Sequence, residues 1–186
     1  MTSIFKNQLI AHSITFSIIV LFAYVTFLFK SQWEVNYDLV GGAALLSYIL
    51  FNLRVMPTVA VAIVVSILIF KQAGIFNIES VMFISICTIG PAIALYIMSS
   101  FKEFNISSIR SISFKQIILL SIVQATFCSI FKLSKSITIT GNIERSDIAN
   151  YFMHIFTVDA LGTLAIVYFA IKIIPLFINL KSAQST

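Results

Sequence analysis

Charged residues are scarce in this sequence. Only 10% of its 186 residues are Asp, Glu, Lys or Arg, against about 25% in an average soluble domain. Hydrophobic residues make up 59%, and a chain of this length has too much surface for its volume to bury them all in water. This composition excludes an ordinary soluble fold, so we expect the lipid bilayer to be the solvent and the first partner of the chain.

The sequence also lacks the motifs of catalytic and metal sites. It has two cysteines, Cys87 and Cys128, both within apolar stretches and without the close spacing of zinc or haem ligands. A Gly-rich phosphate loop, an HExxH motif, a nucleophile elbow and a pair of carboxylates at catalytic spacing are all missing. We therefore expect a non-enzymatic protein that holds no metal and no cofactor, in which both cysteines act as small buried hydrophobes.

Basic residues exceed acidic ones, with 12 Lys and Arg against 7 Asp and Glu. No run of basic residues is interleaved with aromatic ones, as a nucleic-acid surface requires. Lys and Arg in short connectors facing anionic headgroups explain the positive charge better. We expect no nucleic-acid partner.

Long apolar runs are what the sequence does contain, and they predict an all-α, polytopic transmembrane bundle in a single domain, residues 1–186. The first run, Leu9 to Phe29, is too long for a signal-peptide core and lacks a small-residue cleavage site, which favours a retained helix. The connectors are too short for a catalytic domain. The six predicted helices span residues 9–29, 39–52, 56–70, 81–101, 116–131 and 149–171.

Two of these helices form a predicted short hairpin over residues 39–70. The apolar run breaks at Asn52-Leu-Arg-Val-Met-Pro57. Arg54 is costly in hydrocarbon, and Pro57 suits the first turn of a new helix. Each helix is shorter than a usual span, so we expect the pair to be tilted or shielded by neighbouring helices.

The predicted fourth and fifth helices carry features that concern packing. Gly90 and Pro91 lie in the middle of the fourth, where a proline removes a backbone hydrogen bond and usually kinks the helix. The fifth has small residues at four-residue spacing, Ser121, Ala125 and Ser129. Such a stripe predicts close approach of another helix.

The distribution of basic residues predicts the orientation. With six spans, seven basic residues share one side: Lys6, Arg54, Lys102, Arg110, Lys115, Lys172 and Lys181. The five on the other side are Lys30, Lys71, Lys132, Lys135 and Arg145. The positive-inside rule then places both termini in the cytoplasm.

Asp159 is the most informative residue in the chain, because it lies between long apolar runs. An intramembrane carboxylate normally faces the bundle interior or a wet cavity. It is either a contact for a ligand, proton or ion, or a structural group that holds another helix, with Arg54 as a possible partner, and both interpretations stay open. We expect Asp159 to point inward, with Gly162 one turn along letting another helix come close.

Three further polar residues are weaker candidates. His154 lies five positions before Asp159, roughly 140° around the helix, so the two do not form a simple dyad. An interfacial histidine near the helix start is favoured, and His12 in the first helix has the same interpretation. Arg54 is either a turn residue whose charge reaches the headgroups or a partner for an anionic ligand.

Two segments resemble the first membrane-associated sensor (MASE) family. Residues 38–57, DLVGGAALLSYILFNLRVMP, look like the family's early hairpin, where a small-residue helix leads into a turn with a basic residue and a proline. Residues 154–175, HIFTVDALGTLAIVYFAIKIIP, are similar to its last helix, in which a Gly-Asp-x-x-Gly core precedes a Pro-Leu end. Asp159, Gly162, Pro175 and Leu176 occupy the matching positions.

The resemblance implies a stand-alone sensory membrane domain without the cytoplasmic output domain that the family usually carries. We therefore expect a sensor-like or scaffold module of the bacterial inner membrane, which acts through a partner protein, with or without a small ligand. The alternatives are a small-solute transport component, such as a substrate-binding membrane subunit, and an accessory subunit of a larger membrane complex.

Overall fold

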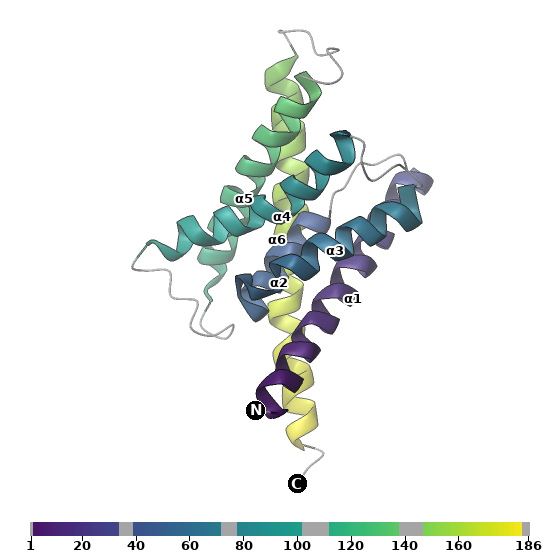
Figure 1. Ribbon diagram of the computed structural model, residues 1–186. Helices are drawn as coiled ribbons and strands as arrows, with labels where there is room; N and C mark the ends of the chain where they lie inside the picture. Colours follow the sequence, from purple (N-terminus) through teal and green to yellow (C-terminus); the bar gives the residue numbers. More distant parts are fainter. Residues whose placement is uncertain (1, 34–38, 72–77, 102–111, 138–146, 184–186) are drawn as a thin grey trace.

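The protein is an all-α bundle, as predicted. The computed structural model describes residues 2–33, 39–71, 78–101, 112–137 and 147–183, with side chains for all but 2–6, 30–33, 71 and 172–183. Within these residues there are six α-helices (Figure 1). They are α1 (Thr2–Trp33), α2 (Val40–Phe51), α3 (Met56–Ser66), α4 (Ile78–Ser99), α5 (Phe114–Lys135) and α6 (Ile148–Ala183).

Five stretches of these residues are long and apolar enough to cross a membrane. They are Asn7–Phe29, Leu53–Phe70, Ile78–Ser99, Phe114–Lys135 and Ile148–Ile171. The sixth helix, α2, has 12 residues and is about 18 Å long at the usual rise per residue. That length is well short of the roughly 30 Å hydrocarbon core.

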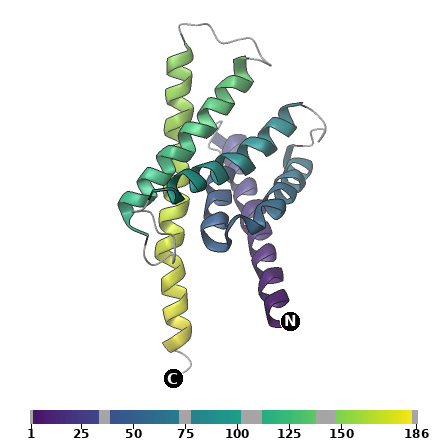
Figure 2. The same cartoon turned by 60° about the vertical axis from the view of Figure 1, so that its left-hand side comes forward.

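The short helix α2 lies inside the bundle, where it packs against α1, α4 and α6 (Figures 1 and 2). Every residue from Val40 to Ile49 is buried. Its first turns carry Gly41, Gly42, Ala43 and Ala44, which let the neighbouring backbones approach closely. Protein rather than lipid surrounds α2, so the shielding predicted for the hairpin applies to α2. The stretch that contains α3, Leu53–Phe70, is long enough to span.

The break between α2 and α3 falls where Arg54 and Pro57 predicted it. Asn52 ends α2 in the left-handed region, with φ of 64°, and its N–H donates to the Tyr48 carbonyl at 2.9 Å. A 3-10 turn, Leu53–Val55, follows. Pro57 then occupies the first turn of α3, where its missing N–H leaves no bond unmade.

The helix ends differ from the predicted ones, because hydropathy marks the part of a helix in lipid rather than its hydrogen-bonded length. The helix predicted at 9–29 is α1, which runs from Thr2 to Trp33. The end predicted at residue 171 is wrong, since α6 continues to Ala183. At the start of α5, Ser113 and Gln116 form a capping box, in which each side chain bonds the other's backbone N–H. This polar start signal precedes the apolar run.

The α-helices alternate in direction along the chain. The start of α1 and the end of α6 lie at the same end of the molecule in both views (Figures 1 and 2). α5 packs along both α4 and α6, and α3 packs on α1. This arrangement brings the middle of α6 against the inward face of α5, beside the first turn of α2.

Candidate functional site

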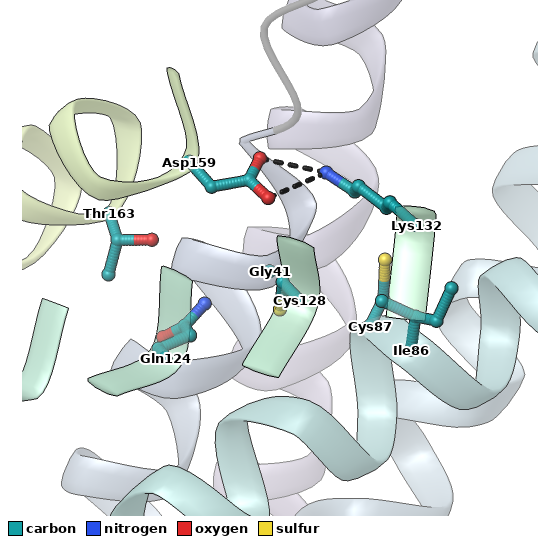
Figure 3. A pocket seen from close by; sticks show the side chains of 8 residues that line it. All are labelled: Gly41, Ile86, Cys87, Gln124, Cys128, Lys132, Asp159 and Thr163. Atoms are coloured by element: carbon teal, nitrogen blue, oxygen red, sulfur yellow. Dashed lines mark hydrogen bonds and ion pairs between the residues drawn. The ribbon is translucent and has the colours of Figure 1, made fainter. Parts of the chain in front are cut away.

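Asp159 forms a buried ion pair with Lys132. The Lys132 ammonium donates to both carboxylate oxygens, with Nζ–Oδ1 and Nζ–Oδ2 distances of 2.7 and 2.9 Å (Figure 3). Asp159 is 5% exposed and lies near the middle of the apolar stretch of α6. Asp159 therefore points inward, as predicted, and it pairs with Lys132 rather than with Arg54, one of the partners that the sequence left open.

Lys132 reaches this position because it stands near the end of α5 with a long flexible stem. Its side chain is 21% exposed, compared with 7% for that of Asp159. A cation in the last turn of a helix also interacts favourably with the carbonyl dipoles there. Pairing with an opposite charge reduces the cost of holding either group inside an apolar bundle.

The ion pair forms one side of a small cavity between four helices (Figure 3). The cavity is lined by Gly41, Ile86, Cys87, Gln124, Cys128, Lys132, Asp159 and Thr163. Its volume is about 10 Å³, close to the space that one water molecule needs. These residues come from α2, α4, α5 and α6, so the site exists only in the folded bundle.

Four-residue spacing places the polar residues of the cavity in two stripes. Gln124, Cys128 and Lys132 follow one another along one face of α5. Asp159 and Thr163 do the same on α6. Because α5 and α6 run in opposite directions, the two charged residues meet nearer one end of the bundle, and Gln124 and Thr163 lie deeper.

Gln124 is the buried polar side chain of the cavity whose hydrogen bonding is incomplete. It is 2% exposed, and its Oε1 has no hydrogen-bond partner among the described residues. Its Nε2 lies on the side of α2, 3.1 Å from where a Cβ on Gly41 would stand. An unmet hydrogen bond on a buried amide costs about 1–3 kcal/mol.

The other predicted site residues lie apart from the cavity. Arg54 and His154 are exposed, Arg54 in the turn between α2 and α3. Gly162 is buried, and a Cβ there would lie 3.3 Å from Leu39 Cδ2. Gly162 thus faces the side chain of the residue that precedes α2. His12 is half-buried, with Nδ1 hydrogen-bonded to Thr58 Oγ1 at 2.6 Å, so it links α1 to α3.

Sequence reasoning missed Lys132 and Gln124. Lys132 lies just beyond the helix predicted at 116–131, because it follows the apolar run. The signal that identifies both is the four-residue spacing of Gln124, Cys128 and Lys132, which runs beside the small-residue stripe. That stripe, Ser121, Ala125 and Ser129, is buried as predicted.

A comparison of the chain with models of known families, with curated proteins and with solved structures finds no match. The resemblance to the MASE family thus has no family-model match behind it. The class that fold and composition define is a multi-pass helical membrane protein, whose described residues contain five apolar helices of spanning length.

Proposed function

We propose that this chain is a non-enzymatic membrane module of the sensor or scaffold kind that acts through a partner protein. Its site of action would be the bacterial cytoplasmic membrane. The observation that carries the proposal is the buried Lys132–Asp159 ion pair at the cavity. An ionisable pair inside an apolar bundle marks a functional site more often than other buried residues do.

The ion pair suits a responsive role because it is a poor way to obtain stability alone. Apolar side chains of similar volume commonly hold buried positions as well as an ion pair does, or better. Breaking the pair, in contrast, changes the attachment of α5 to α6. A proton or ligand that neutralises Asp159 would release Lys132, whose more exposed side chain can reach the headgroups. The contact between α5 and α6 would then loosen.

The non-enzymatic part of the proposal is based on the sequence, which contains none of the catalytic motifs described above. The sensory part is supported by the resemblance of residues 38–57 and 154–175 to the MASE family. In such a module, neutralising Asp159 would alter how α5 packs on α6. A partner protein bound to the bundle would respond to this altered packing.

The size of the cavity bears on the alternatives. Space for about one water molecule leaves no room for an organic solute in this conformation, which weakens the transport alternative. An accessory subunit that stabilises a larger complex stays the second candidate, because the bundle offers helix surfaces to a neighbour. The sensor-like module and the accessory subunit differ in whether partner binding depends on the ion pair.

The test is gentle-detergent purification of the full chain from its host membrane, followed by mass spectrometry of the co-purifying proteins. We expect a defined partner with the wild-type chain and a changed partner yield with Asp159→Asn. Lys135→Gln is the matched control, since Lys135 lies one turn along α5 and its pair with Glu79 is longer, at 4.0 Å, and more exposed. A partner retained equally by all three chains favours the accessory subunit, and a chain that is monomeric throughout contradicts both.

A further inference from the structure

We propose that the cavity beside the Lys132–Asp159 pair is a binding site for a single water molecule, anchored by the side-chain amide of Gln124. This inference rests on the proposed function insofar as both concern the same cavity. It names the ligand that occupies the cavity while the ion pair is intact.

The unmet hydrogen bond of Gln124 is the first argument. Its Oε1 is buried without a partner among the described residues, and buried amide oxygens in folded proteins are almost always bonded to protein or ordered water. Rotating the amide by 180° would exchange Oε1 and Nε2. Water both donates and accepts, so it satisfies the amide in either orientation.

The size of the cavity is the second, independent argument. A space of about 10 Å³ is about what one water molecule needs. A bound water also needs two to four polar partners. Besides Gln124, the lining supplies the Asp159 carboxylate, which accepts hydrogen bonds, and the Thr163 hydroxyl, which both donates and accepts.

The charge of the site selects a neutral ligand. Lys132 and Asp159 cancel each other at 2.7 Å. A small cation would be repelled by the ammonium, and a small anion by the carboxylate. A neutral dipole is attracted by both, and it solvates the pair without disturbing its net charge.

Water-edited solid-state NMR of the full chain in lipid bilayers, with glutamine labelled, tests this inference. We expect magnetisation to pass rapidly from water to the Gln124 side-chain amide, even though that side chain is only 2% exposed. Gln124→Met identifies the signal by its loss. If the wild-type chain gives no such transfer at Gln124 while helical circular dichroism shows it folded, the inference is overturned.

Two glycine substitutions form a matched pair for the same measurement. In Gly41→Ala the new Cβ would stand at the cavity lining, 3.1 Å from Gln124 Nε2, and would take up room that the water needs, so the transfer should be lost. In Gly162→Ala the new Cβ would meet Leu39 instead, outside the cavity lining, so the transfer should persist. Transfer unchanged in Gly41→Ala would contradict the assigned site.

The two proposals fail separately. If the Gln124 water signal is absent but partner binding still depends on Asp159, only the inference about water is contradicted. If the Gln124 water signal is present but the chain binds no partner, the water site is supported and the proposed function is contradicted.

Discussion

At the scale of single residues, the two members of the ion pair differ in how far they can leave the bundle. Asp159 has a short side chain that is 7% exposed, whereas Lys132 has a long one that is 21% exposed. A lysine without its partner can extend its ammonium toward the headgroups. An aspartate without its partner stays where it is, and its charge is left uncompensated.

We therefore predict that the two single substitutions are unequal. Lys132→Met should lower the free energy of unfolding by about 3–5 kcal/mol, the usual effect of leaving a buried charge unpaired. Asp159→Asn should cost less, about 1–3 kcal/mol, because the ammonium of Lys132, released from the ion pair, can extend to the headgroups instead of staying buried. Steric-trapping measurements of unfolding in bicelles distinguish the two.

The double variant Lys132→Met with Asp159→Leu removes both charges and should be more stable than Lys132→Met alone. Lys135→Gln is the control for charge removal at this end of α5 and should change stability by no more than about 0.5 kcal/mol. Equal losses of unfolding free energy in the two single variants would show that Lys132 cannot move its ammonium to the headgroups when Asp159 is neutral.

A second prediction concerns Tyr48, which links α2 to α4. Its hydroxyl donates to the Thr88 carbonyl at 3.0 Å, and the side chain is 1% exposed. Tyr48→Phe should lower the free energy of unfolding by about 0.5–1.5 kcal/mol. Tyr96→Phe, at a position 69% exposed, should have almost no effect. An equal response of the two variants in the same unfolding measurement would contradict the role assigned to the Tyr48 hydroxyl.

At the scale of helices, the parts of the fold that could be predicted are those with a local cause. Arg54 and Pro57 indicate the break between α2 and α3 by themselves, because a charge and a missing N–H each disfavour a continuous apolar helix. Helix ends were less predictable, since α6 continues beyond its apolar stretch to Ala183. Backbone hydrogen bonding, which hydropathy does not measure, decides where such a helix ends.

One part of the candidate site could likewise be predicted from the sequence, and another part could not. Asp159 could be found from the sequence because a carboxylate between apolar runs is costly wherever it lies. Its partner could not, because which cation reaches it depends on how α5 lies along α6. The role of Gln124 could not be predicted either, because it depends on how close Gly41, on another helix, lies to the Gln124 amide.

The contact between α2 and α6 gives a third prediction. A Cβ on Gly42 would lie 3.0 Å from Thr163 Cα, and backbone cannot move aside as a side-chain end can. Gly42→Ala should push α2 away from α6 and cost about 1–3 kcal/mol. Gly162→Ala meets only the flexible end of Leu39 at 3.3 Å and should cost less. Unfolding of both variants in bicelles checks the order, and a reversed order would contradict the packing of α2 on α6.

At the scale of the whole molecule, the short helix α2 decides the topology. The five helices of spanning length in the part of the chain that the structure describes would place the two termini on opposite sides of a membrane if α2 did not count as a crossing. α2 nevertheless carries the chain back through the bundle interior, so the start of α1 and the end of α6 lie together (Figures 1 and 2). If α2 counts as a crossing, the chain crosses six times, once through a helix that the bundle buries.

The last prediction is that both termini face the cytoplasm. The common end of α1 and α6 makes the two termini share a side, and the seven-to-five distribution of basic residues chooses the cytoplasm. A reporter that is active only in the periplasm should give no signal when fused after Thr186. The same reporter fused after Ile137, beyond α5, should be active, which controls for expression and insertion. Activity after Thr186 together with activity at an N-terminal fusion would reverse the orientation but keep six crossings. Activity at only one of the two termini would mean that α2 does not count as a crossing.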